Sequence, residues 1–81
     1  MASVIIFSKD GCERCEKAKA WAARHHGEDF EVRSSEVIED GSMGDGPVAR
    51  RILRLFLARS KMVPFVTVND EPLPYSYDFE Q

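Results

Sequence analysis

Runs of apolar and polar positions predict a strand, a helix and a second strand in the first half of the chain. Residues 4–7 form a continuous apolar run rich in β-branched side chains, typical of a strand buried on both faces. A helix is expected over residues 13–26, because small residues recur along one face and Gly27 follows as a C′ glycine. Residues 30–34 are β-prone, so the intervening helix makes the two strands parallel, with a right-handed crossover.

The second half contains one more helical pattern and one more extended pattern. Residues 36–46 hold three glycines and four acids, which predicts a mobile loop. Pro47 fits the first turn of a helix expected over residues 48–60, whose apolar positions follow helical spacing. Residues 63–68 form the third predicted strand, and residues 69–71 form a hairpin turn.

The C-terminal residues leave room for little regular structure. Pro72 and Pro74 limit the segment after the turn to a short edge strand, and residues 75–81 are too few for more than one or two helical turns. A chain of 81 residues buries only about 60–65% of its unfolded surface. With no internal repeat and no linker, residues 1–81 are expected to form a single α/β domain.

Composition excludes several function classes. The 43% apolar content is too high for disorder, and a net charge of −3 does not suggest a general nucleic-acid or membrane binder. The first residues lack a basic segment, and the apolar run after them is too short for a signal peptide or a membrane span. A cytoplasmic protein is therefore expected, in a compartment where paired cysteines are more often catalytic or metal-binding than structural.

The two cysteines, Cys12 and Cys15, carry the clearest chemical signal. They stand directly after the first strand, in a Cys-Glu-Arg-Cys motif that opens the predicted helix. Unpaired backbone N–H groups and the helix dipole favour an anion there, which lowers the pKa of a thiol at that position. Cys12 is therefore expected to be the exposed nucleophile, and Cys15, one turn deeper, the resolving thiol. Lys9 and Arg14 add positive charge nearby.

Other chemistry for the cysteines stays open. A zinc site needs four ligands, and the only other soft ligands are His25 and His26, a helix length away. The histidines fit a solvated helix end better than a metal site. The basic residues of the second long helix are consistent with a solvated face or with electrostatic attraction of an acidic partner.

In four segments the chain resembles the glutaredoxins and related small redoxins of the thioredoxin superfamily. Residues 7–15, Phe-Ser-Lys-Asp-Gly-Cys-Glu-Arg-Cys, are similar to the family's active-site stretch, with Lys9 three positions before the first cysteine. Residues 62–64, Met-Val-Pro, stand where the family has Thr-Val-Pro. Residues 65–69 match the strand and turn after it. Asp78 falls near the family's acidic residue at the start of its last helix.

The resemblance implies a thioredoxin fold: a three- to four-stranded mixed sheet, two main helices, and a C-terminal helix that is here shortened or absent. It also implies a cis peptide bond before Pro64, which would turn the Val63 backbone toward the cysteines to pair with an extended substrate. The family's Gly-Gly is replaced by Pro74-Tyr75. With the last helix lost, Tyr75, Tyr77 and Phe79 are expected to cover the exposed sheet face, unless a partner does so.

The resemblance further implies a dithiol–disulfide oxidoreductase that uses Cys12 and Cys15, with Lys9, Arg14, Val63, Pro64, Tyr75 and Asp78 as substrate-binding candidates. Glutathione is the expected electron donor, with no resident cofactor or metal. The Tyr-Ser-Tyr segment at residues 75–77 is similar to redoxins that serve ribonucleotide reductase and are reduced by thioredoxin reductase. A non-catalytic zinc or iron–sulfur module, the latter bridging two chains, is the competing interpretation. The protein is expected to act as a monomer on disulfide-containing proteins.

Overall fold

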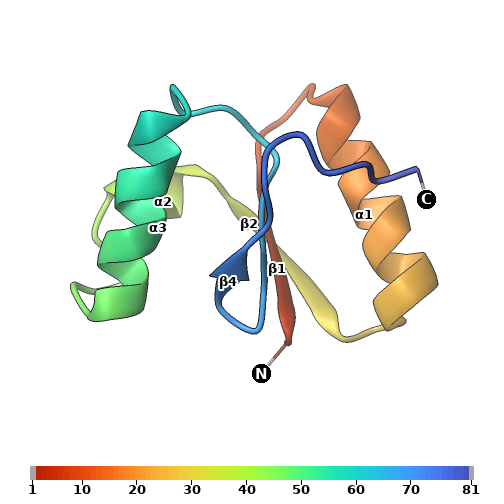
Figure 1. The fold of residues 1–81 in the computed structure, drawn as a ribbon, viewed down its shortest axis with the longest axis horizontal. Helices are drawn as coiled ribbons and strands as arrows, with labels where there is room; N and C mark the ends of the chain where they lie inside the picture. The colour runs from red at the N-terminus through yellow and green to blue at the C-terminus, as the bar shows by residue number, and fades with distance from the viewer. Residues whose placement is uncertain (1, 81) are drawn as a thin grey trace.

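The computed structural model describes residues 2–80 as a four-stranded mixed sheet between helices on its two faces (Figure 1). In chain order the elements are β1 (Val4–Ser8), α1 (Glu13–His26), β2 (Phe30–Ser34), α2 (Glu36–Glu39), α3 (Pro47–Ala58), β3 (Phe65–Val68) and β4 (Glu71–Pro72). The strand order is β2-β1-β3-β4, with β1 parallel to β2 and antiparallel to β3, and with β4 antiparallel to β3. This arrangement is compatible with a thioredoxin-like fold.

The predicted strands and long helices are confirmed, with small shifts at their ends. The second strand and the first helix have the expected bounds, and Gly27 has a positive φ of 61° at the helix end. α3 includes Pro47 and ends at Ala58, two residues earlier than expected. β3 begins at Phe65 instead of residue 63, because the two residues before it form no ladder pair with β1.

The segment over residues 36–46 was expected to be a loop throughout, and this was wrong for its first residues. α2 forms there because Ile38 is buried among the side chains on the α3 face of the sheet. The Glu36 N–H also donates to Ser34 Oγ at 3.2 Å, which supplies a partner for an orphan N–H of the first turn. Tertiary burial of one apolar side chain therefore overrides a turn-rich composition.

Two apolar clusters hold the helices to opposite faces of the sheet. On the α1 face, Val4 and Ile6 pack with Ala18 and Ala22, whose small side chains let the helix approach closely. On the other face, Phe7 and the rest of a second cluster pack under α2 and α3. No helix among residues 2–80 is long and apolar enough to cross a membrane.

The C-terminal tail covers part of the α1 face of the sheet. It forms no helix through residue 80 and folds back along α1 (Figure 1). The ring centroids of Tyr77 and Phe79 each lie 5.4 Å from that of Trp21, and Phe79 is only 5% exposed. The expected covering role is thus confirmed for Tyr77 and Phe79, while Tyr75 lies elsewhere.

Polar contacts from α1 fix the same tail. Arg24 Nη2 donates to the Phe79 carbonyl oxygen at 2.8 Å, and Lys17 Nζ forms an ion pair with Glu80 at 2.7 Å. The hydrogen bond and charge of Glu80 raise the pKa of Lys17. Since the pair is exposed, it orients the tail more than it stabilises the fold.

A two-residue hairpin loop joins β3 to β4. Asn69 and Asp70 both have positive φ, 50° and 67°, as a type I′ turn requires. Asp70→Gly is expected to raise stability by about 0.5 kcal/mol, because glycine adopts left-handed φ without the Cβ clash. Thermal unfolding should show Tm rising by about 2–4 °C. Asp70→Ala is the matched control and should lower Tm; a lower Tm for Asp70→Gly would contradict the turn assignment.

Candidate active site

The two cysteines are joined as a disulfide at the N-terminus of α1. Cys12 is the N-cap residue, with extended φ and ψ, and its Sγ accepts a hydrogen bond from the Cys15 N–H at 3.1 Å. The Cα atoms are 5.2 Å apart, within the range that disulfides bridge. Gly11, with φ of +75°, makes the turn from β1 into the helix. The pair therefore occupies the anion-favouring end of the helix that the sequence predicted.

The two cysteines differ in solvent exposure. Cys15 is 1% exposed and belongs to the apolar cluster beneath α3, whereas Cys12 is partly exposed at its edge. Cys12 is therefore the more accessible of the two residues. This asymmetry fits an outer attacking thiol and an inner resolving thiol.

The backbone of Val63, which is distant in sequence, lies beside the cysteines. Cys12 Sγ lies 3.9 Å from the Val63 carbonyl oxygen, and the Val63–Pro64 peptide bond is cis, as expected. Both residues are buried, and the Val63 N–H takes no part in the hydrogen bonds formed among residues 2–80. The backbone of Val63 is therefore placed to meet a segment that approaches Cys12.

Arg14 lies between the cysteines in sequence, but its guanidinium reaches the tail. Arg14 Nη2 donates to the Tyr75 carbonyl oxygen at 2.8 Å, and the guanidinium carbon lies 4.8 Å from the centroid of the Tyr75 ring. This cation–π contact and hydrogen bond hold the chain after Pro74 beside the start of α1. Arg14 and Tyr75, proposed from separate motifs, thus form one unit.

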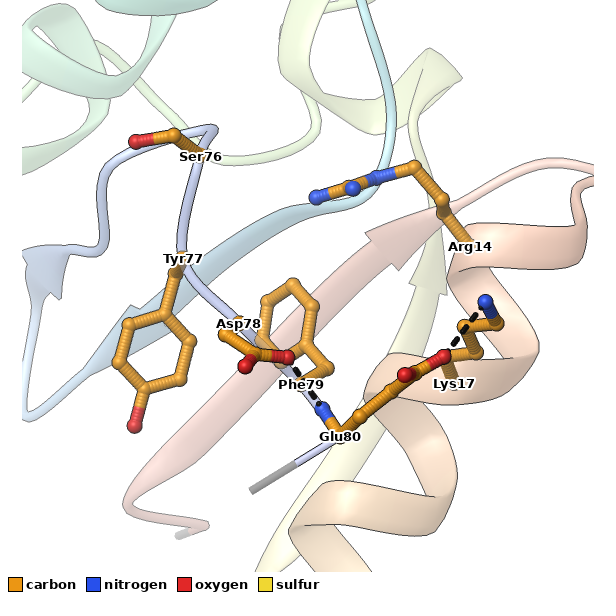
Figure 2. Close-up of a pocket in the computed structure, with 7 residues that line it drawn as sticks. All are labelled: Arg14, Lys17, Ser76, Tyr77, Asp78, Phe79 and Glu80. Atoms are coloured by element: carbon orange, nitrogen blue, oxygen red, sulfur yellow. Dashed lines mark hydrogen bonds and ion pairs between the residues drawn. The ribbon is translucent and has the colours of Figure 1, made fainter.

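A shallow pocket of about 320 Å³ lies between α1 and the tail (Figure 2). Its lining residues are Arg14, Lys17, Ser76, Tyr77, Asp78, Phe79 and Glu80. Asp78 begins no helix; its Oδ1 accepts a hydrogen bond from the Glu80 N–H at 2.9 Å. The candidates Arg14 and Asp78 therefore line one hollow, as the side chains in Figure 2 show.

Lys9 lies in a different part of the surface. It is exposed and lines a pocket of about 310 Å³ with Lys61, Glu39 and residues 34–36. Lys61 already pairs with Glu39 at 3.2 Å. The structure thus divides the proposed substrate-binding residues into Lys9 on one side and the Arg14–Tyr75 unit with Asp78 on the other.

The histidines have an aromatic neighbour. The rings of His25 and His26 lie 5.9 Å and 5.2 Å from that of Trp21 at the end of α1. Within residues 2–80, no group of three or more His, Cys, Asp or Glu side chains is gathered as a metal site. The described part of the chain therefore gives the zinc interpretation no ligand set.

The sequence reasoning missed that one stripe of α1 holds the tail. Arg14, Lys17, Trp21 and Arg24 recur at helical spacing, and each contacts a residue between 75 and 80. The signal was present in the sequence as three cations and a tryptophan on one helix face. It would have indicated a segment laid along that face, though not which segment.

Comparison of the chain with protein-family models, with curated proteins and with solved structures found no significant match. The cysteine pair and the groups that surround it therefore remain the evidence for function.

Proposed function

We propose that the protein is a glutaredoxin-like dithiol–disulfide oxidoreductase that reduces disulfides of proteins or of glutathione adducts. The observation that carries the proposal is the Cys12–Cys15 disulfide at a helix N-terminus, in which Cys12 is partly exposed and Cys15 is buried. The resemblance of residues 7–15 and 62–64 to redoxin motifs supports the same reaction class.

The reaction is two thiol–disulfide exchanges in sequence. The Cys12 thiolate attacks one sulfur of the substrate disulfide, forming a mixed disulfide and releasing the other substrate sulfur as a thiolate that takes a proton. The Cys15 thiolate then attacks Cys12 Sγ, which releases the second substrate thiol and leaves Cys12 and Cys15 joined. The substrate gains two electrons, and a thiol donor returns them to the protein.

The backbone supplies most of the stabilisation for the Cys12 thiolate. The Cys15 N–H already donates to Cys12 Sγ, and it would donate more strongly to an anion at the same position. Arg14 contributes less than its sequence position suggested, because its guanidinium is engaged by the carbonyl and ring of Tyr75. The attacking group is thus activated by the helix terminus more than by a neighbouring side chain.

The Val63 backbone supports binding of an extended substrate segment. A strand-like segment that carries a disulfide to Cys12 passes the unpaired Val63 N–H and the carbonyl beside Cys12 Sγ. Main-chain pairing of this kind holds many sequences, so one carrier can serve several disulfide-containing proteins. Ribonucleotide reductase is a candidate substrate, because the Tyr-Ser-Tyr tail is similar to that of redoxins that serve this enzyme.

The electron donor is tested by a coupled NADPH assay in the reducing conditions of a cytoplasm. One arm contains glutathione with glutathione reductase, and the other contains thioredoxin reductase, each with a small disulfide substrate. We expect turnover with the glutathione couple. Turnover with thioredoxin reductase alone would assign the protein to the alternative redoxin class, and turnover with neither donor would contradict the proposed function.

A further inference from the structure

Among residues 2–80, no strand pairs with the outer edge of β2. β2 is the outermost strand in the order β2-β1-β3-β4, and residues 32–34 are exposed. Val32 is 43% exposed, although its neighbour in β1, Ile6, is fully buried. An apolar residue at the centre of an unpaired edge strand indicates a surface suited to pairing with another strand.

Two hydrogen bonds define which backbone groups face outward. The Val4 N–H donates to the Asp29 carbonyl at 3.4 Å, and the Ser35 N–H donates to the Ser8 carbonyl at 2.8 Å. Odd-numbered residues of this strand therefore direct their backbone groups toward β1. Because successive residues of a strand alternate, the N–H and C=O groups of Phe30, Val32 and Ser34 face the open edge.

We infer that β2 pairs antiparallel with β2 of a second copy of this chain, about a two-fold axis at Val32. In this register Val32 lies opposite the same residue of the second copy, and Phe30 lies opposite Ser34. The backbone N–H and C=O groups of all three residues face outward. In each pair, the two residues therefore donate and accept hydrogen bonds across the interface. The two four-stranded sheets then join into one continuous sheet.

Charge complementarity selects this register. Glu31 and Arg33 lie on one face of β2, where they form an ion pair at 2.6 Å while both stay partly exposed. With the axis at Val32, each Glu31 faces Arg33 of the other copy. An axis at Glu31 or at Arg33 would instead set like charges opposite each other, which is unfavourable across strands. The isologous pairing is therefore self-complementary in charge as well as in hydrogen bonds.

Within the part of the chain that the structure describes, the surface beside β2 has no strong charge of one sign that would repel a second copy of the chain. Lys9, Asp10 and Lys19 line the same hollow as Val32, and Lys19 pairs with Glu16 at 3.1 Å. A five-residue edge buries less than the roughly 1,000 Å² typical of stable complexes. The association is accordingly weak and reversible, and it replaces the expected monomer only at high protein concentration.

Sedimentation equilibrium in reducing buffer tests the pairing with charge-reversed variants. The wild-type chain is expected to show a monomer–dimer equilibrium between about 10 µM and 1 mM, the range of weak association. Glu31→Arg or Arg33→Glu, each alone, places like charges opposite and should weaken self-association by about tenfold or more. Near-ultraviolet circular dichroism confirms that each variant keeps the wild-type fold.

Mixing the two variants provides the matched control. Arg at 31 in one chain then faces Glu at 33 in the other, so the mixture should regain dimer, as should the double variant E31R/R33E. A wild-type chain that stays monomeric at 1 mM would overturn the inference, as would single variants that associate like the wild type. Since the readout is mass and not disulfide exchange, the result is independent of the proposed function.

Discussion

Replacing Cys12 with serine is expected to reduce the rate of disulfide reduction to that of the uncatalysed reaction. Serine is close to cysteine in size, and its hydroxyl oxygen can cap the helix in place of Sγ, but it cannot form the mixed disulfide on which both exchange steps depend. Loss of a nucleophile that the reaction cannot bypass lowers turnover by on the order of 10³-fold or more. The measurement is NADPH oxidation in the coupled assay with whichever donor supports the wild-type chain.

Cys15→Ser is the matched control because it removes only the resolving thiol. Cys12 can still attack, so the variant should accumulate a mixed disulfide with the substrate, visible as an added mass that a strong reductant removes. If Cys12→Ser retained the wild-type rate, or if Cys15→Ser formed no mixed disulfide with the substrate, the assignment of roles would be wrong. An inactive but folded Cys12→Ser chain, checked by circular dichroism, supports it.

Phe79→Ala is expected to cause the largest loss of stability among single substitutions in the tail. Phe79 is buried against Trp21 and Tyr77 on the α1 face of the sheet, with its ring centroid 5.1 Å from that of Tyr77. Removing a buried phenylalanine ring costs about 3 kcal/mol. This is a large part of the roughly 4–12 kcal/mol expected for a chain of 81 residues.

Thermal and urea unfolding measure the effect, with Tm expected to fall by about 12–24 °C at this chain length. Leu57→Ala is the matched control, because Leu57 is 51% exposed on α3 and its truncation should change stability by less than about 0.5 kcal/mol. A chain ended after Pro74 should unfold at least as easily as Phe79→Ala. Unchanged Tm in both tail variants would show that the tail does not stabilise the domain.

The sequence predicted the fold correctly in segments whose structure depends on residues within the same segment. The β-branched run of β1, the small face and C′ glycine of α1, and the alternation in β2 each follow from local periodicity. Pro47 likewise marked a helix start because its fixed φ suits the first turn. α2 was missed because four residues form a helical turn there only when Ile38 has a cluster to bury into.

The sequence predicted only part of the candidate site. The cysteine pair follows from its own spacing and from the strand before it, since a helix N-terminus and the residue one turn further in are local geometry. The role of Arg14 depends on which group its guanidinium contacts in the folded chain. The sequence placed its charge beside Cys12, but Tyr75, far along the chain, engages the guanidinium.

By itself, then, the sequence determined the order of strands and long helices and the position of the cysteine pair at the start of α1, because these depend on neighbours within a few residues. Only the tertiary structure decided that Arg14 contacts Tyr75, that burial of Ile38 makes residues 36–39 helical, and that no strand among residues 2–80 pairs with the outer edge of β2. These features depend on contacts between distant segments, which arise once the sheet has set the strand order and the two helical faces have been filled.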